Sequence, residues 1–402
     1  MKKILVFWMA FVFIHSSILW AGGWSNMLMG ARAMAIGGAF SAVADDPSAI
    51  FHNPAGLSFQ NEGLQFSLDG FYVWPTHDFV TPSGTRAQSK WNNAIPQIFV
   101  SYKVNEKTTV GFGAYVPYAG GGVDWKKEDL GIPLKSYMGV YCLTPALSYQ
   151  LSNRLSLGFE LNFYRALLSV DTEVPNVGQM NTEESGSSLS ASLGLLFRPS
   201  QRVAFGLSIR GPSTIKLSGE SSFVTVVPGL GTIKFTRNSE TDIKLPWDLE
   251  IGFSFRLAEN FLFSTGAQYT LWSVLDKVHK KIEDVPFLGD IETDEVMNFK
   301  DILVLRAGLE YLLPGGIALR GGIGYDPSAT PNESLNERNI DVDKLSLLGG
   351  IGYRAGRMQI DFVYIYVSGK EREKTITNFG FPLTTRYNLN VNILGLGVTF
   401  SF

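Results

Sequence analysis

Hydrophobic residues alternate with polar or small residues along most of the chain beyond residue 63. In the stretch 154–174, for example, Leu157 and Phe159 alternate with Glu160 and Asn162. A period of two places successive side chains on opposite faces of a β-strand, so the pattern predicts an all-β protein. The fourteen predicted strands cover residues 63–73, 92–104, 107–117, 136–151, 154–174, 186–198, 201–219, 240–256, 260–275, 302–313, 316–326, 344–354, 357–371 and 386–402.

The connections between these strands are short and long in turn. The turn Asn105-Glu106 is followed by the long connection 118–135, and the turn at 152–153 by the long connection 175–185. This asymmetry is typical of a transmembrane antiparallel β-barrel of the bacterial outer membrane, whose short turns face the periplasm. The apolar faces then contact lipid and the polar faces line the lumen, because backbone groups in hydrocarbon must pair within a closed sheet. A soluble β-sandwich would share the alternation, but its strands are usually shorter.

The eighth predicted strand has a long apolar face. Ile243, Leu245, Trp247 and Leu249 share one parity, whereas Asp248 has the other. This parity predicts that all four apolar side chains face lipid.

The last strand is less regular. Its end, 396–402, alternates apolar residues and finishes on an aromatic residue, as do the strands that barrel-insertion machinery recognises. Upstream, Leu389, Val391 and Ile393 have the opposite parity. Two explanations remain open: either a bulge near Gly395 shifts the phase, or part of the inner face is apolar.

The N-terminus has the pattern of a secretion signal. Two lysines precede an apolar run from Ile4 to Ile14, and residues 19–21 form an acceptable cleavage site. The sequence therefore predicts a signal peptide at residues 1–21. A membrane anchor is disfavoured because the run is too short and is interrupted at His15.

Residues 22–62 are predicted to form a compact hatch, or plug, inside a barrel made by residues 63–402. The segment is rich in Ala and Gly and lacks a strand-length alternation. Asp46-Pro47 starts a short helix, with Asp as N-cap and Pro at the first helical position. Pro54 ends that helix, because the residue before a proline is driven out of the α region.

Composition argues against other classes of protein. The net charge is −3 and the pI about 5.9, so the chain has no excess of positive charge that would favour binding to nucleic acid. The single cysteine, Cys142, excludes a disulfide framework and a four-thiolate metal site. The short GxGxxA match at Gly350–Ala355 runs into a predicted turn rather than a helix, so it does not indicate a nucleotide site. We predict no enzyme activity, no cofactor and no metal.

Several motifs resemble those of the FadL/TodX family of outer-membrane transporters for hydrophobic compounds. Asn53-Pro54-Ala55 is similar to the plug motif of that family, and the resemblance extends over nearly the whole mature chain. Further similar stretches are Ala44-Asp45-Asp46, Lys244-Leu245-Pro246, Tyr269-Thr270-Leu271-Trp272-Ser273 and Arg320-Gly321-Gly322-Ile323-Gly324-Tyr325-Asp326. The resemblance implies passive uptake of long-chain fatty acids or hydrocarbons through plug rearrangement and a lateral exit. PorV-like barrels, which serve a secretion system, carry a similar Gly37–Asp46 stretch and are the alternative.

Transport of this kind requires a gate and, for a fatty acid, an anchor for the head group. Asn53, Pro54 and Ala55 are the candidate gate, although the triplet can also be a simple helix stop. Arg210 and Arg306 are the candidate head-group anchors, unless they only pair with lumen carboxylates. Those carboxylates are Glu160, Asp248, Glu250, Glu310 and Asp361.

The lateral exit and the capture of substrate also have candidates. The family picture places a side opening at the third strand, where Gly111, Gly113 and Pro117 weaken the strand ladder. Aromatic residues in the long connections either form a capture groove or belong to the aromatic girdle of the membrane interface; they are Phe79, Trp91, Tyr118, Trp125 and Phe287. The expected partners are a hydrophobic ligand, outer-membrane lipid and lipopolysaccharide, and the barrel-insertion machinery, with the protein a monomer.

Overall fold

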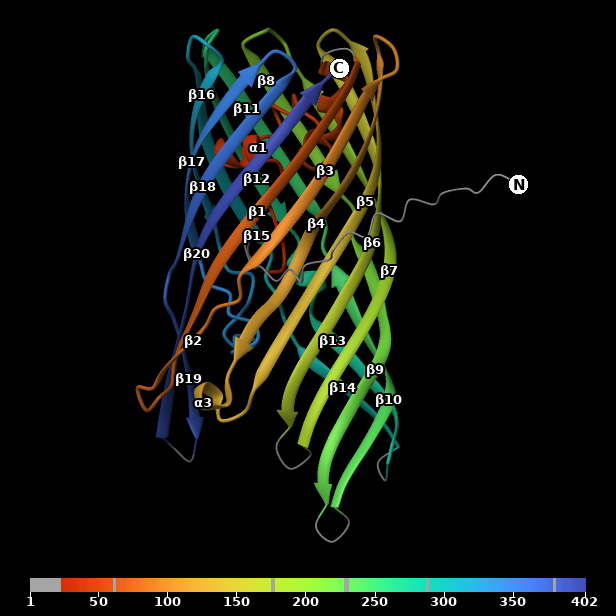
Figure 1. Cartoon of the computed structure of the whole chain (residues 1–402), viewed down its shortest axis with the longest axis vertical. Helices are drawn as coiled ribbons and strands as arrows, with labels where there is room; N and C mark the ends of the chain where they lie inside the picture. The colour runs from red at the N-terminus through yellow and green to blue at the C-terminus, as the bar shows by residue number, and fades with distance from the viewer. Residues whose placement is uncertain (1–22, 61–62, 175–177, 228–230, 287–288, 379–380) are drawn as a thin grey trace, which may run out of the picture.

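The computed structural model describes residues 23–60, 63–174, 178–227, 231–286, 289–378 and 381–402. The signal peptide predicted at residues 1–21 lies outside this range. The described strands form one antiparallel sheet that closes on itself (Figure 1). Closure is made by β1 and β20, which pair from Gln65 with Ser401 to Val80 with Arg386. The prediction of a closed β-barrel is thus confirmed.

The barrel has fourteen strands, as the alternation predicts, and each strand pairs with its neighbours along the chain. They are β1 (Gly63–Val80), β3 (Asn93–Lys103), β4 (Thr108–Trp125), β5 (Leu134–Ser152), β6 (Leu155–Val174), β7 (Gly178–Phe197), β8 (Val203–Arg210) continued by β9 (Ser213–Val227), β10 (Gly231–Leu245) continued by β11 (Asp248–Ala258), β12 (Phe261–Thr270), β15 (Ile302–Leu312), β16 (Ile317–Asp326), β17 (Lys344–Ala355), β18 (Met358–Gly369) and β20 (Phe381–Ser401).

The remaining elements are short. Within the described residues, no helix is long and apolar enough to cross a membrane. The shorter strands are β2 (Arg86–Ser89), β13 (Lys277–Val285), β14 (Gly289–Val296) and β19 (Arg372–Asn378). The helices are α1 (Ala31–Ala35), α2 (Ala49–His52), η1 (Pro54–Phe59), α3 (Lys127–Leu130) and η2 (Trp272–Val274).

Most connections predicted as long loops are in fact strand extensions. Residues 220–227 and 231–239, for example, belong to β9 and β10 and pair from Glu220 with Asn238 to Val227 with Gly231. One face of this hairpin carries polar residues such as Ser222 and Thr236, joined by an exposed hydrogen bond, whereas Phe223 on the other face is buried. The apolar outer face that marks a lipid-facing strand is therefore lost while the backbone pairing continues. Connection 327–343 is different: it carries the buried side chains of Leu335, Ile340 and Val342 and packs in the main hydrophobic cluster.

The inner faces of the strands change character along the barrel. On β18, Asp361 lies toward the short-turn end, and the inward-facing residues that follow are Val363, Ile365 and Val367, all fully buried. On β20, Leu389, Val391 and Ile393 are also fully buried, and the pairing with β1 continues past Gly395 without a shift. An apolar inner face therefore explains the parity of the last strand. The lumen is polar near the short turns and apolar toward the long connections.

The predicted lipid-facing run of the eighth strand is wrong at its start. Ile243 and Leu245 are buried inside the barrel, whereas Trp247 and Leu249 are exposed on the outside. Pro246 interrupts the strand between β10 and β11. Proline lacks the N–H that strand pairing needs, so the pairing is interrupted there. The side chains of odd-numbered residues point into the lumen before Pro246 and toward the outside after it.

Candidate functional site

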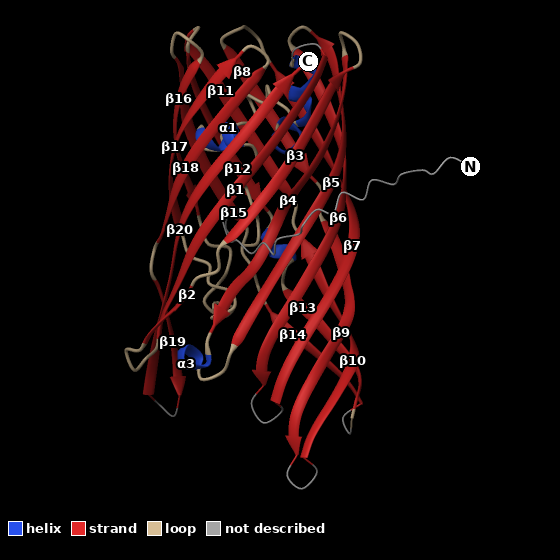
Figure 2. Cartoon of the chain, in the orientation of Figure 1, coloured by secondary structure: helices blue, strands red, loops and turns tan. Residues whose placement is uncertain are grey.

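Residues 23–60, hereafter the plug, lie inside the barrel in the half that carries the short turns (Figures 1 and 2). Nearly all of the side chains from Ser25 to Leu57 are buried. Hydrogen bonds from lumen side chains reach the plug backbone from strands all around the barrel. Gln97 bonds the backbone on both sides of Met29, Ser148 and Ser156 donate to Ala55 O, and Ser254 donates to Ala42 O. The polar half of the lumen is therefore a seat for plug backbone.

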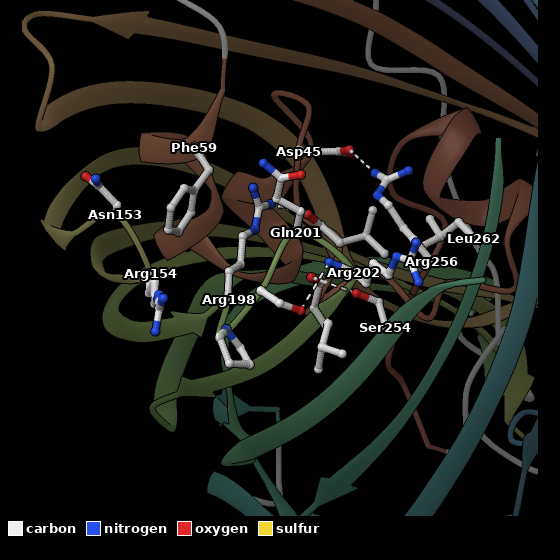
Figure 3. A pocket seen from close by; sticks show the side chains of 15 residues that line it. Asp45, Phe59, Asn153, Arg154, Arg198, Gln201, Arg202, Ser254, Arg256 and Leu262 are labelled. Atoms are coloured by element: carbon white, nitrogen blue, oxygen red, sulfur yellow. Dashed lines mark hydrogen bonds and ion pairs between the residues drawn. The ribbon is translucent and has the colours of Figure 1, made fainter. Parts of the chain in front are cut away.

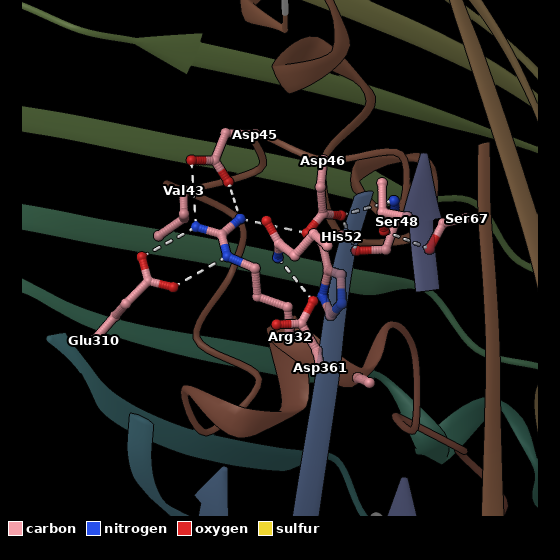
Figure 4. A network of polar contacts seen from close by, with 12 residues as sticks. Arg32, Val43, Asp45, Asp46, Ser48, His52, Ser67, Glu310 and Asp361 are labelled. Atoms are coloured by element: carbon pink, nitrogen blue, oxygen red, sulfur yellow. Dashed lines mark hydrogen bonds and ion pairs between the residues drawn. The ribbon is translucent and has the colours of Figure 1, made fainter. Parts of the chain in front are cut away.

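An arginine of the plug is the centre of a buried charge network (Figure 4). Arg32 pairs with Asp45 and lies 3.1 Å from Glu310 Oε2 on β15. Arg320 extends the network, with contacts of 2.7 Å to Glu310 and 2.7 Å to Asp361. Burial alone would raise the pKa of Asp45, but the Arg32 guanidinium holds that pKa below its ordinary value. The network fixes α1 against β15, β16 and β18.

Asn53 joins three parts of the structure. Its side-chain amide donates to Ser41 O at 2.8 Å and to Leu195 O at 3.0 Å, and its Oδ1 accepts from Ala55 N at 3.2 Å. It thus ties one plug loop to another and both to β7. The expected helix start is nearly in place: Asp46 accepts from Ser48, and α2 begins at Ala49.

His52 is fully buried in the plug. Its Nε2 lies 3.0 Å from the carbonyl oxygen of Met29, and since a carbonyl only accepts, this nitrogen donates. Burial lowers the pKa of His52 to about 4, so the ring is neutral at pH 7. The imidazole ring packs edge-on against the rings of Phe40 and Phe51. His52 is therefore a packing residue of the plug.

The N-terminal end of the plug replaces part of the barrel wall. The ladder between β3 and β4 ends at Ile98 and Ala114, after which β4 shifts register between Tyr115 and Tyr118. Beyond this point the freed edge of β4 pairs with the plug. Asn26 N donates to Pro117 O, and Ala119 N to Trp24 O, each at 2.8 Å. Where β4 leaves β3, the plug thus takes the place of β3 beside β4 through a single antiparallel bridge between Ser25 and Tyr118.

A cavity of about 260 Å³ lies next to this point, on the side of the long connections. We call it the upper chamber. Its wall is mainly apolar, with Trp24 at one end in edge-on contact with Trp272 and Phe299. Other apolar wall residues are Met138, Leu168, Val170, Ile243, Val278 and Met297. Lys280, Glu295 and Arg338 add a charged margin, in which Arg338 pairs with Glu295.

The model of one protein family, described as "Outer membrane protein transport protein (OMPP1/FadL/TodX)", matches residues 13–402. This match covers the plug and the whole barrel. The chain belongs to the OMPP1/FadL/TodX family. It is therefore an outer-membrane protein of a family of transport channels for hydrocarbons and fatty acids.

Individual relatives and solved structures are also similar to this OMPP1/FadL/TodX member. A 47 kDa outer membrane protein of Pasteurella multocida is 25% identical over 342 residues, which are 77% of each chain. A FadL homologue of Pseudomonas aeruginosa has a TM-score of 0.81 at 19% identity, over 95% of this chain and all of that one. The toluene transporter TodX of Pseudomonas putida has a TM-score of 0.77 at 16% identity, over 93% and 98%. The structural likenesses establish the shared fold.

The structure of this OMPP1/FadL/TodX member places both candidate head-group anchors in ion pairs inside the lumen. Arg210 donates to Phe51 O at 3.0 Å and lies 3.9 Å from Asp248. Arg306 contacts Asp326 at 3.0 Å. Neither arginine lines the upper chamber. Sequence reasoning missed Lys280, which does line it, because nothing in its neighbourhood shows that the strand turns inward.

The candidate side-opening residues divide into two groups. Gly111 and Gly113 face the plug, where a Cβ at either position would lie 3.0 Å from the side chain of Ile50. They allow close packing of the plug. Pro117, in contrast, lies at the register shift of β4.

The candidate capture aromatics lie mostly inside the barrel rather than in an outer groove or girdle. Phe79, Tyr118 and Trp125 are all buried. Trp91 is half-buried, with Lys135 over its ring at 4.9 Å. Phe287 lies outside the described residues.

Proposed function

We propose that the protein takes up hydrophobic small molecules, long-chain fatty acids or hydrocarbons, by passive diffusion. A substrate would enter from the long connections, occupy the upper chamber, and leave sideways into the membrane after the plug moves. The proposal rests chiefly on one observation. Trp24 forms the wall of the apolar chamber and also belongs to the plug segment that pairs with β4 where β4 leaves β3.

Chamber occupancy has an adequate driving force. Each methylene transferred from water into an apolar site contributes about 0.8 kcal/mol. Apolar side chains make most of the wall, and the inner faces of β9, β10, β18 and β20 nearby are apolar as well. A saturated or aromatic hydrocarbon therefore has a continuous surface to follow from the long-loop end to Trp24.

The lateral exit that we propose lies between β3 and β4, beyond the end of their ladder. In the present state the plug covers this place from inside. Gly30 N donates to Gln97 Oε1 at 3.1 Å, and Asn26 Nδ2 to Val116 O at 2.6 Å. Withdrawal of residues 24–30 would uncover the route, and Pro117, which donates no ladder hydrogen bond, favours separation there. Asn53, Pro54 and Ala55 would hold the rest of the plug in its seat during the movement.

For a fatty acid we propose Lys280 as the anchor of the carboxylate. Its Nζ lies 3.2 Å from Thr182 Oγ1 at the margin of the chamber, and no ion pair of Lys280 is found within the described residues. Arg338 is already paired with Glu295. Arg210 and Arg306 are engaged with Asp248 and Asp326, so a substrate would have to break a buried pair to use them.

Filling the chamber should stop uptake. Met138 is buried in the chamber wall, and Met138→Trp would place an indole in the space that a substrate needs. We expect uptake of radiolabelled oleate or hexadecane by cells to fall by roughly tenfold or more, since overpacking at such a site costs 1–3 kcal/mol. Leu143→Trp, which faces lipid on the same strand, should retain uptake. Equal uptake in the two variants would favour the secretion-partner alternative, which needs no ligand in the chamber.

Removing the charge of Lys280 should separate the two substrate classes. A hydrogen bond to a charged group contributes about 1.5–3 kcal/mol, so Lys280→Gln should weaken oleate binding by about tenfold or more. Binding of neutral hexadecane should not change. The measurement is equilibrium dialysis of both labelled ligands against the purified barrel, with Lys277→Gln, an exposed lysine on the same strand, as the control. If both ligands are weakened equally, Lys280 only supports the chamber wall.

A further inference from the structure

A second cavity, of about 610 Å³, lies among the short turns at the other end of the barrel. Figure 3 shows the side chains that line it. We call it the mouth cavity. It is enclosed by the plug loop at residues 42–45, by the turn at Asn153 and Arg154, and by the turn at residues 198–203. Lumen residues near the ends of β11 and β12 complete the wall. Because short turns face the periplasm, the mouth cavity opens to that compartment.

The mouth cavity has a strong excess of positive charge. Four arginines line it, and Asp45 is the single acidic residue among the described residues that do so. Asp45 also forms an ion pair with Arg32, and Arg32 does not line the cavity. The four arginines are Arg154, Arg198, Arg202 and Arg256. A concave wall with charges of one sign concentrates the field and attracts counter-ions.

Two of these arginines are held in place by the plug. Arg198 Nη2 donates to Val43 O at 3.1 Å, and its guanidinium stands 4.3 Å from the centre of the Phe59 ring. Arg256 Nη2 lies 4.0 Å from Asp45. A guanidinium whose position is already fixed loses little freedom when a ligand binds, so these two form a preorganised floor.

The other two arginines extend from the turns. Arg154 and Arg202 are exposed, and within the described parts of the chain neither side chain has a hydrogen bond or an ion pair. Their donors are therefore available to an occupant. Guanidinium groups match the paired oxygens of carboxylates and phosphates, with two parallel hydrogen bonds each.

From this arrangement we infer that the mouth cavity binds a small anion that carries phosphate or carboxylate groups. Its volume lies in the range of small-molecule sites, about 300–1,000 Å³. The site is independent of the proposed transport function, because the plug separates it from the upper chamber. Its anion has two possible sources: a phosphate compound of the periplasm, or a carboxylate-bearing amphiphile.

Calorimetric titration of the purified full-length barrel, in a neutral detergent at low salt, tests this inference. The probes are pyrophosphate and octanoate. We expect at least one of them to bind, and the double variant Arg154→Gln/Arg202→Gln to weaken that binding by roughly tenfold or more, as the loss of charge-assisted hydrogen bonds requires. Salt at about 0.5 M should weaken it as well, because exposed charges are screened.

Arg357→Gln is the matched control, since Arg357 is an exposed arginine in another short turn and does not line the mouth cavity. A loss confined to pyrophosphate identifies the phosphate source, and a loss confined to octanoate identifies the amphiphile. Octanoate that binds in the upper chamber is recognised by its loss in Lys280→Gln. The inference is overturned if neither probe binds, or if the double variant binds every probe that the unmodified protein binds with unchanged affinity.

Discussion

Oxidation of a Ser25→Cys/Tyr118→Cys variant should abolish uptake of oleate and hexadecane, and reduction should restore it. Ser25 and Tyr118 are directly opposite each other where the plug pairs with β4. The hydrogen bonds Asn26 N to Pro117 O and Ala119 N to Trp24 O flank them, so they form a non-hydrogen-bonded pair. Cα atoms in such a pair are about 4.5 Å apart, which a disulfide can span.

The expected effect is large because the disulfide would oppose the movement on which transport is proposed to depend. While the disulfide is intact, residues 25 and 118 cannot separate by more than the length of the bridge, so the oxidised protein should show no uptake above that of cells lacking the protein. Uptake by the same cells before and after reduction with dithiothreitol is the measurement. The native Cys142 is buried, and Cys142→Ser in the background removes any competing thiol.

The two single cysteine variants serve as controls, and neither should respond to oxidant. Tyr118→Cys also loses the hydrogen bond from Tyr118 to Asp248, and the single variant reports that cost separately. Full uptake by the oxidised double variant would show that residues 24–26 remain on β4 during transport. That result would remove the proposed lateral route.

Arg32→Met should release the plug while leaving the barrel folded. The substitution removes the cation that Asp45, Asp46 and Glu310 share in a buried place. Breaking a buried ion pair from one side costs about 3–5 kcal/mol, because the remaining charges are left without compensation. The cost falls on the seating of the plug, since Glu310 keeps its contact with Arg320 and the strand ladders are unaffected.

Amide hydrogen exchange of plug peptides is the measurement for Arg32→Met. Peptides from residues 31–59 should exchange faster by about two to nearly four orders of magnitude, which corresponds to about 3–5 kcal/mol. Peptides from β18 and β20 should not change. The double variant Arg32→Gln/Asp45→Asn removes charge from both sides and should recover part of the protection. Unchanged exchange in Arg32→Met would mean that the Asn53 contacts alone seat the plug.

The sequence predicted the strand count and the closure of the barrel well because both depend on local patterns. Leu157 and Phe159 face outward, as their parity requires, and both are exposed to the lipid side. Side-chain direction in a strand follows from period two alone, and the solvent on each face selects the residue type. Where Pro246 changed the phase, the same reasoning failed for Ile243 and Leu245.

The upper chamber, the mouth cavity and the ion pairs of the lumen were harder to predict from the sequence. Arg210 and Arg306 pair with Asp248 and Asp326, which come from other strands. Asp248 was among the carboxylates expected to pair with them, whereas Asp326 was not. Lys280 lies on β13 and Trp24 in the plug, and only the folded chain brings both to the wall of the upper chamber. No pattern in either neighbourhood predicts that they meet there. The mouth cavity likewise collects its arginines from three separate parts of the chain.

Alternation, turn length and Gly/Ala content are local properties of the sequence, and they were enough to predict a fourteen-stranded outer-membrane barrel with a small N-terminal plug. The folded barrel was needed to show which inward faces are apolar, which charges pair, and where the plug replaces β3 beside β4. These features depend on contacts between residues such as Arg32 and Glu310, which are 278 positions apart. Barrel closure brings such residues together, and a local sequence pattern contains no information about contacts between distant residues.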